Sequence, residues 1–474
     1  MSHAPSAPLP RRLKLLYGAG DWGLASFNTL RQIFYAIFLT DVVGLDARLA
    51  SLVALVGMLW DALNDPLIGT FSDRLRTRWG RRRPFLLFFA VPFGLGFVLQ
   101  WWAPPWDSQL ALTLSAGLAF MLCDTLQSLI AVPYASLTPE LAGDYDERTS
   151  LTGYRMFFNL CASLVTAVAA PILVQSGPDQ RSGYLLMAAI FGALAAVPLL
   201  LIGLLIRERP APAADAASAP PLRASLRAIW RNIPFRWATL LYLCNWVIFD
   251  LVALMLPYFL IYHVAGGDLR AMARLGGIEV ALASAVLGVM LIVSVAALPL
   301  WLWLAQRMGK ARAYVAAMAL WAAVQLTLGA VPPGRTGLVL LLAVLAGVAV
   351  AAAHVLPDAI FPDVIDWEAA RTGQRREGIY YGVKNLTRKL TGAIAIFLAL
   401  QALGWAGYQA PAADSLQATQ PPAALAAIRL LMGVVPALLI GAAAFVAWRY
   451  PLTRERHQRI QQILARRARR ASQQ

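Results

Sequence analysis

The chain has 474 residues, of which 59% are hydrophobic and only 14% are charged. Its mean hydropathy of +0.61 and its recurring long apolar runs exclude a soluble globular protein and indicate a multi-pass membrane protein. The net charge of +16 does not indicate a nucleic-acid partner, because most of the 41 Lys and Arg residues lie in alternate connections between the runs.

This alternation of charge predicts the orientation of the chain in the membrane. The opposite connections hold only Arg48, Arg181, Arg270, Arg274 and Arg335. The positive-inside rule therefore places both termini in the cytoplasm, and we expect a protein of a bacterial-type inner membrane. We expect it to contact the lipid bilayer and a small-molecule substrate, to act as a monomer and to need no cofactor.

The apolar runs predict an all-α membrane protein with twelve transmembrane helices. The predicted spans are 14–41, 46–73, 83–103, 109–136, 149–175, 182–206, 235–264, 277–306, 311–331, 336–364, 378–406 and 424–448. Residues 1–206 and 235–449 are each expected to form a six-helix bundle. A charged, Ala/Pro-rich cytoplasmic linker at 207–234 would join them, and 450–474 would form a basic cytoplasmic tail. A weak echo between the halves, Pro139-Glu140 and Pro362-Asp363, is typical of a transporter repeat.

Several spans carry polar side chains, which cannot face lipid cheaply and should line the bundle interior or a wet cavity. They are Asp21, Asn28, Arg31 and Gln32 in the first span, Asp124, Gln127 and Ser128 in the fourth, Arg155 and Asn159 in the fifth, Asn245 and Asp250 in the seventh, His354 and Asp358 in the tenth, and Lys384, Arg388 and Lys389 in the eleventh. For each cluster a buried structural network is the alternative interpretation.

The second span carries the most informative pattern. Asp61 and Asp65 are four residues apart and share one helix face, with Asn64 beside them and Pro66 next in the chain. Two carboxylates at membrane depth predict a site for a cation or a proton. The alternative is that both pair with basic side chains and only hold the bundle together.

The connection after this span contains six arginines between Arg74 and Arg83. Asp73 ends the second span, and Arg81, Arg82 and Arg83 lie at the cytoplasmic end of the third. We expect these four residues to form a cytoplasmic charge latch that biases the conformation. The alternative is that the arginines only set the topology.

An enzyme or a non-transporting sensor is disfavoured, because the sequence has no paired catalytic His, no Ser nucleophile motif and no metal-ligand spacing. Cys123, Cys161 and Cys244 all fall inside predicted spans and suggest neither a disulfide nor a zinc site.

Three stretches resemble the glycoside–pentoside–hexuronide:cation symporters of the major facilitator superfamily, of which the melibiose permease is the best-known member. They are Tyr17-Gly18 with Thr40-Asp41-Val42-Val43-Gly44-Leu45, Trp60-Asp61-Ala62-Leu63-Asn64-Asp65-Pro66 with the basic loop to Pro84, and the stretch from Pro362 to Lys389. The resemblance covers nearly the whole chain and implies the major facilitator fold, with a substrate cavity between two six-helix halves.

The resemblance also implies roles for single residues. Asp61, Asn64, Asp65 and Ser128 would bind the coupling cation, Na⁺ or H⁺, and Lys389 would couple that site to transport. Together with the polar stripes, it gives a substrate site of Asn28, Arg31, Gln32, Asp124, Gln127, Arg155, Asn159, Tyr380 and Lys384.

The sequence departs from the melibiose-type sugar site. Ala25 and Ala131 stand where melibiose permeases hold the galactosyl group with aspartates, Ala135 replaces a sugar-stacking tryptophan, and Met58 replaces an arginine. We therefore expect a cation-coupled symporter of a sugar, glycoside or uronide that binds melibiose poorly. The alternative is a symporter of lysophospholipids or other amphiphiles, because a lipid-transporting branch of the family shares the aspartate pair and the lysine.

Overall fold

The computed structural model describes residues 9–75, 77–141, 145–206, 232–275, 277–372, 377–411 and 417–452, together with 456, 459, 460 and 462. Most of the predicted linker and of the predicted tail lies outside the described residues. So do a few side chains inside helices, among them that of Asp73.

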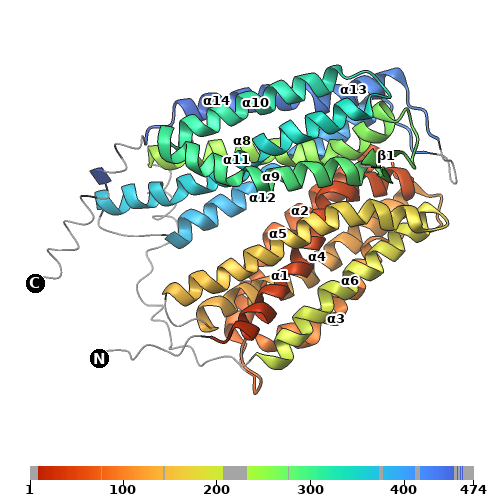
Figure 1. Ribbon diagram of the computed structural model, residues 1–474. Helices are drawn as coiled ribbons and strands as arrows, with labels where there is room; N and C mark the ends of the chain where they lie inside the picture. Colours follow the sequence, from red (N-terminus) through yellow and green to blue (C-terminus); the bar gives the residue numbers. More distant parts are fainter. Residues whose placement is uncertain are drawn as a thin grey trace, which may run out of the picture.

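The described residues of the first half form six long helices that pack on one another (Figure 1). They are α1 (Arg11–Ile37), which continues as the π-helical turn η1 (Phe38–Val42), α2 (Ala47–Arg74), α3 (Arg83–Gln100), α4 (Gln109–Leu141), α5 (Tyr145–Ser176) and α6 (Gln180–Leu205). Helix α1 packs against α5 and α6, and α3 packs against α4 and α6.

The second half has the same plan, except that two short strands precede its second helix and its last span is divided into two helices. It contains α8 (Ile233–Tyr258), which continues as the π-helical turn η3 (Phe259–Val264), the strands β1 (Met272–Leu275) and β2 (Ile278–Ala281), and then α9 (Leu282–Met308), α10 (Lys310–Ala330), α11 (Thr336–Thr372), α12 (Glu377–Trp405), α13 (Pro422–Met432) and α14 (Val434–Trp448). Helices α13 and α14 meet at Gly433, which lies against Gly329 of α10. A Cβ on Gly433 would be only 2.8 Å from the Gly329 Cα, so the close approach requires glycine.

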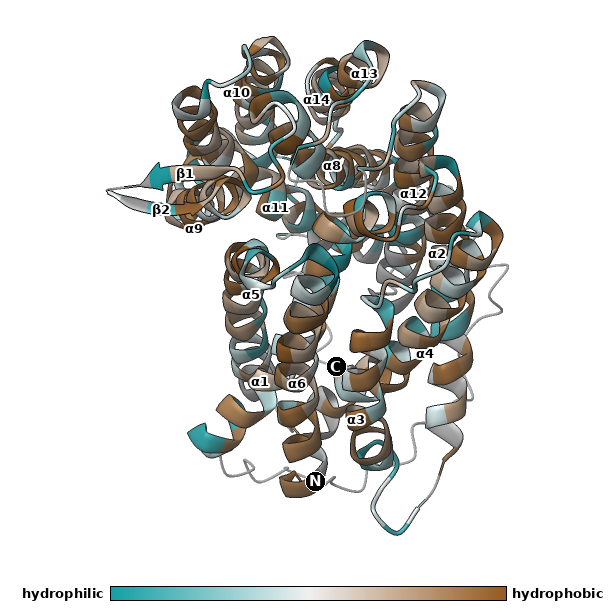
Figure 2. Cartoon of the chain, turned by 90° about the vertical axis from the view of Figure 1, so that its right-hand side faces the viewer, coloured by the Kyte–Doolittle hydropathy of each residue, from teal (hydrophilic) through white to brown (hydrophobic). Residues whose placement is uncertain are grey.

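Eleven of the described helical segments are long and apolar enough to cross a membrane. Helix α1 is not among them, since it carries the polar stripe of Asp21, Asn28, Arg31 and Gln32. Its 27 residues nevertheless span about 40 Å, more than the hydrocarbon core. With α1 included, the helices agree with the twelve spans expected from the sequence. The view in Figure 2 shows mostly hydrophobic ribbon along the helices of both halves.

The structure corrects the expected start of the eighth span. That span was placed at 277, but residues Met272–Ala281 form an antiparallel hairpin in which Met272 pairs with Ala281, and α9 begins only at Leu282. Gly277, with a φ of +90°, provides the turn. The protein is therefore all-α except for this hairpin. Below, the end of the bundle with the hairpin is called the hairpin end, and the end where α1 begins and α14 ends is called the terminal end.

The two halves meet along three pairs of helices, α2 with α12, α5 with α9, and α1 with α8. Figure 2 shows the first two pairs side by side. Near the hairpin end, the Gln401 amide donates to Ser51 Oγ at 3.0 Å, and Ser284 Oγ donates to the Val168 carbonyl at 2.7 Å. The described hydrogen bonds between the halves lie in the middle of the bundle and at this end, so the halves are joined there.

Candidate functional site

Lys389 of α12 lies between the two aspartates of α2. Its Nζ is 2.6 Å from Asp61 Oδ2 and 2.5 Å from Asp65 Oδ2. Ser128 of α4 donates its hydroxyl to Asp65 Oδ1 at 2.7 Å. The side chains of Lys389 and Asp65 are 35% and 34% exposed, so the cluster is not fully enclosed by protein. Three residues of the expected cation site, Asp61, Asp65 and Ser128, thus meet the expected coupling residue, Lys389. The ion pairs of Lys389 join the two halves of the protein.

Asn64, the fifth residue of that expectation, lies on the same helix between the two aspartates. Its side chain is buried, and its amide nitrogen has no hydrogen-bond partner among the described residues. The structure therefore places Asn64 next to the cluster without a contact to Lys389.

Arg31 of α1 and Asp124 of α4 form an ion pair of 2.6 Å between Nη1 and Oδ1. The guanidinium lies over the rings of Phe27 and Phe120, at 5.0 and 4.8 Å from their centroids. Asp124 is fully buried, and its second oxygen has no partner among the described residues. Both residues were expected to bind substrate, but in this conformation each neutralises the other.

The second arginine of the expected substrate site, Arg155 of α5, pairs with Asp21 of α1. Its Nε is 2.5 Å from Asp21 Oδ2, and its Nη2 donates to Oδ1 at 3.2 Å. The Tyr134 hydroxyl is 3.1 Å from the same carboxylate, and the Arg155 guanidinium lies 4.7 Å from the Tyr134 ring centroid. The two arginines that could have bound an acidic sugar are thus already neutralised by aspartates.

Three of the other expected substrate residues lie on α1, α4 and α5. The Gln127 amide donates to Asn28 Oδ1 at 3.2 Å, and Asn28 is exposed. On α5, Asn159 follows Arg155 by one turn and precedes Ser163 by another, so the three share a helix face. These residues form a polar path from Asp21 and Arg155 toward the middle of the bundle.

Lys384 and Tyr380 of α12 lie apart from this path. The Lys384 ammonium pairs with Asp358 and lies over the rings of Tyr242 and Phe361. Tyr380 is buried near the start of α12, where its hydroxyl accepts a hydrogen bond of 2.8 Å from Asn232. The structure therefore does not bring Tyr380 together with the N-terminal polar residues of the expected substrate site.

Sequence reasoning listed Asp250 and Arg388 only as polar residues within spans, without a role in the site. Arg388 donates both terminal nitrogens to Asp250, at 2.7 and 2.9 Å, and Gln32 donates its amide to the same carboxylate at 2.9 Å. The side chain of Gln32, the last of the expected substrate residues, thus forms a hydrogen bond from the first half to the second. The adjacency of Arg388 and Lys389 was the available sequence signal, but sequence alone does not show the pairing.

The described hydrogen bonds of Arg82 and Arg83, two arginines of the expected latch, lie within their own half. Arg82 is buried and donates to Ser72 Oγ at 2.6 Å, and Arg83 donates to the carbonyls of Gly203 and Leu204 at 3.0 and 3.2 Å. Arg81 lies in the connection before α3. The side chain of Asp73 is outside the described residues, so the latch stays a prediction.

A cluster of hydroxyl groups at the hairpin end encloses Asp41 of η1, which sequence reasoning did not assign to a site. Asp41 accepts hydrogen bonds from Tyr262 of η3, from Tyr408 and from Thr40. The Thr40 hydroxyl also lies 2.9 Å from the Tyr258 hydroxyl. The carboxylate therefore joins the π-helical turns that end the first helix of each half. π-Helical turns occur frequently at functional sites.

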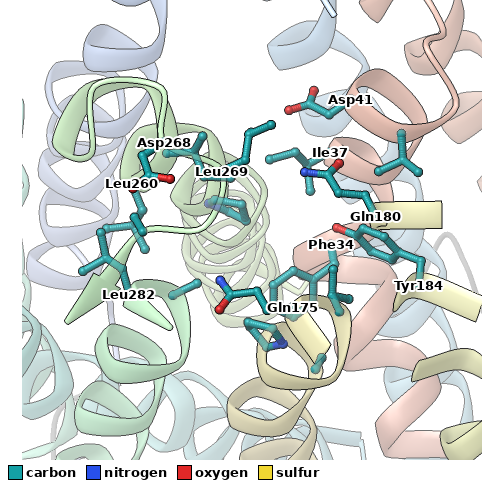
Figure 3. A pocket seen from close by; sticks show the side chains of 18 residues that line it. Phe34, Ile37, Asp41, Gln175, Gln180, Tyr184, Leu260, Asp268, Leu269 and Leu282 are labelled. Atoms are coloured by element: carbon teal, nitrogen blue, oxygen red, sulfur yellow. The ribbon is translucent and has the colours of Figure 1, made fainter. Parts of the chain in front are cut away.

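Beside this cluster lies a pocket of about 90 Å³ between the halves (Figure 3). Asp41, Ile37 and Tyr184 line it from the first half, and Leu260 and Asp268 line it from the second. Because Asp41 both borders the pocket and bridges the halves, we interpret the cluster as the closure of the hairpin end.

We expect Asp41→Ala to open this end. Each lost hydrogen bond to a charged acceptor is worth about 1.5–3 kcal/mol, which is enough to change the balance of conformations at least tenfold. The measurement is the distance between spin labels at Pro105→Cys and Pro333→Cys in a variant without the native cysteines. Tyr184→Phe is the control, because no described hydrogen bond of its hydroxyl joins the halves. An unchanged distance distribution in Asp41→Ala would remove the closure role.

A larger cavity, about 190 Å³, lies deeper between the halves. Its lining comes from α1 and α5 of the first half and from α8, η3, α9, α10, α11 and α13 of the second, with Gln32 among its few polar groups. The Asp250–Arg388 pair contacts two lining residues: Gln32 donates to Asp250, and the ring centroid of Trp246 is 4.4 Å from the Arg388 guanidinium carbon. This is the largest of the described cavities between the halves.

Comparison with known proteins gives consistent results. A family described as MFS/sugar transport protein matches residues 16–454. An uncharacterized symporter of Synechocystis sp. is 31% identical, over 95% of this chain and 96% of its own. The isoprimeverose transporter of Lactiplantibacillus pentosus is 25% identical over 87% and 84%, and a sodium-dependent lysophosphatidylcholine symporter of Danio rerio is 25% identical over 94% and 86%.

Solved structures show the same fold. The nucleoside transporter NupG, in a D323A mutant, superimposes with a TM-score of 0.64 over 93% of this chain and 99% of its own, at 11% sequence identity. At that identity the likeness shows the fold alone. The fold class expected from the sequence is confirmed.

Proposed function

The chain belongs to the MFS/sugar transport family of membrane transporters, and on that premise we propose that it is a cation-coupled symporter of a sugar or glycoside. The observation that carries the proposal is the position of Lys389 between Asp61 and Asp65. The ammonium occupies the place that a coupling cation would take.

The residues of this cluster fit a hard cation. Two carboxylates and the Ser128 hydroxyl supply oxygen ligands of the kind that hard cations prefer, and either carboxylate could instead take a proton. The cation and Lys389 would therefore compete for Asp61 and Asp65. In the cation-free state Lys389 neutralises part of their charge, which lowers the cost of holding two carboxylates at membrane depth.

This competition gives a physical form to coupling. The aspartates belong to α2 in the first half and Lys389 belongs to α12 in the second, so cation binding would loosen a bridge between the halves. It would also release the part of α12 that carries Arg388, the residue before Lys389. Arg388 contacts the cavity wall in two ways: it binds Asp250, which accepts from Gln32, and its guanidinium lies over the Trp246 ring. Because such coupling is reciprocal, substrate at that wall would in turn favour the cation-bound state.

The acidic-sugar option loses support from the geometry. Arg31 and Arg155 are each paired with an aspartate, so neither offers an uncompensated positive charge in this conformation. A neutral glycoside remains the better candidate. Melibiose should still bind poorly, because Ala25 and Ala131 supply no hydrogen-bond acceptors.

The test is uptake into proteoliposomes under an imposed Na⁺ gradient or pH gradient. We expect one of the gradients to drive accumulation of a glycoside, the matching ionophore to abolish it, and melibiose to compete weakly. Strong competition by melibiose would contradict the interpretation of Ala25 and Ala131. Glycoside movement that ignores both gradients would contradict symport.

A second candidate is symport of a lysolipid, favoured by the largely apolar lining of the 190 Å³ cavity and by the relative from Danio rerio. Accumulation of a lysophosphatidylcholine, with no glycoside accumulated under either gradient, would establish it instead.

A further inference from the structure

The 190 Å³ cavity is called here the aromatic cavity, because its wall in the second half is formed largely by aromatic rings. Trp246 and Phe249 of α8, Trp321 of α10 and His354 of α11 contribute their rings to its lining. The Phe249 ring centroid is 5.1 Å from that of Trp321 and 4.4 Å from that of His354, in tilted and edge-on contacts. The wall thus offers several ring faces and edges to a flat apolar group.

One lining residue has an unmet hydrogen-bonding capacity. Gln325 of α10 is 1% exposed, and its Nε2 has no acceptor among the described residues. A buried donor without an acceptor is unfavourable, so the cavity favours a ligand that brings an acceptor to this place. On the opposite side Gln32 is fixed by Asp250, and Ser163 of α5 borders the cavity at the end of the polar path.

We propose that the aromatic cavity receives the aryl aglycone of a glycoside, whose sugar lies along the polar path of Asn28, Gln127 and Asn159. The inference rests on the proposed symport of glycosides and names the substrate class: a sugar linked to a single aromatic ring that carries a hydrogen-bond acceptor. Trp246, Phe249 and Trp321 contact the ring, and Gln325 donates to its acceptor.

The size of the cavity distinguishes this ligand from a lysolipid. A dry cavity of about 150 Å³ in another protein holds benzene, so 190 Å³ suits one aromatic ring with a small substituent. A lysolipid acyl chain has more than twice as many carbon atoms as benzene, so it would have to extend beyond this volume. The Gln325 amide would also face an acyl chain without an acceptor.

The experiment measures binding of matched methyl, phenyl and 4-nitrophenyl glycosides of glucose, galactose and xylose to the purified full-length protein. For the preferred sugar we expect the phenyl compound to bind about tenfold more tightly than the methyl compound, because only the phenyl ring is buried against the aromatic wall. The nitro group should add about fivefold through Gln325.

Two variants with a control locate the effect. Ala346→Leu fills the aromatic cavity and should remove most of the phenyl advantage, whereas Ala319→Leu, an exposed position of α10, should keep it. Gln325→Leu changes the volume little and should remove the preference for nitrophenyl over phenyl. It tests the cavity even if Ala346→Leu fails to fold.

The outcomes separate the two proposals. Equal binding of methyl and phenyl glycosides, or a phenyl advantage unchanged in Ala346→Leu, would overturn the aryl site and leave sugar symport standing. Lysophosphatidylcholine bound in preference to every glycoside and lost in Ala346→Leu would overturn both. Failure of the wild type to bind any glycoside in the presence of Na⁺ or at acidic pH would also overturn both.

Discussion

Replacing Asp61 or Asp65 by Asn should reduce uphill uptake of substrate to the level of liposomes without protein. An amide cannot balance the charge of a bound cation, and Lys389 would then neutralise the one remaining carboxylate permanently. The cation would have no site, and the gradient could no longer drive transport. Uptake against a concentration gradient in proteoliposomes measures this effect.

Substrate binding and exchange should survive in part in Asp61→Asn and Asp65→Asn, because the aromatic cavity is formed by other residues. Asp107→Asn is the matched control, since Asp107 is an exposed carboxylate in the connection before α4 and should leave uptake unchanged. Normal uphill accumulation in either cluster variant would refute the assignment of the cation site.

Asp250→Ala should lower the stability of the protein more than the replacement of an exposed carboxylate by Ala. Asp250 is 4% exposed and is the shared acceptor of Arg388 and Gln32, so its removal leaves a guanidinium without its counterion. Breaking a buried ion pair from one side typically costs about 3–5 kcal/mol. Thermal unfolding of the purified protein in detergent should show a clear fall in the transition temperature.

Two further variants separate charge from packing. The double variant Asp250→Ala/Arg388→Met should recover part of the stability, because no unpaired charge remains. Glu279→Ala is the control: its partner is Arg274, and the two side chains are 55% and 81% exposed, so the loss should stay below about 1 kcal/mol. A double variant no more stable than Asp250→Ala would show that packing, and not the unpaired charge, determines the loss.

The helices could be predicted from the sequence because each apolar run is long enough to cross the membrane and each connection is polar. The ends were less predictable where a helix leaves the membrane. Helix α11 continues to Thr372 and α4 to Leu141, since a helix surrounded by water need not be apolar. The hairpin at Met272–Ala281 was missed, although Gly276-Gly277 between two short alternating segments is a turn signal.

The polar residues of the site were identifiable as such, but their partners were not. A charge in a span predicts a buried partner, and its identity depends on which helices the fold brings together. Arg31 finds Asp124 within the first half, whereas Lys389 finds Asp61 and Asp65 across the interface. For that reason the pairing of Arg388 with Asp250 could not be predicted from the sequence, and Asp41 was recognised only as part of a motif.

Helix α12 also has a consequence for how the protein is made. Its three cations, Lys384, Arg388 and Lys389, find their carboxylates on three other helices, α11, α8 and α2. In a lone transmembrane helix a Lys or Arg opposes insertion by about 2.5–3.5 kcal/mol at the membrane centre, and by less near the helix end, where these three cations lie. All three partner helices leave the ribosome before α12 does. During synthesis the carboxylates are therefore already present when α12 enters the bilayer, and removing one on α8 or α2 should make insertion less favourable for a cation made 138 or 324 residues later.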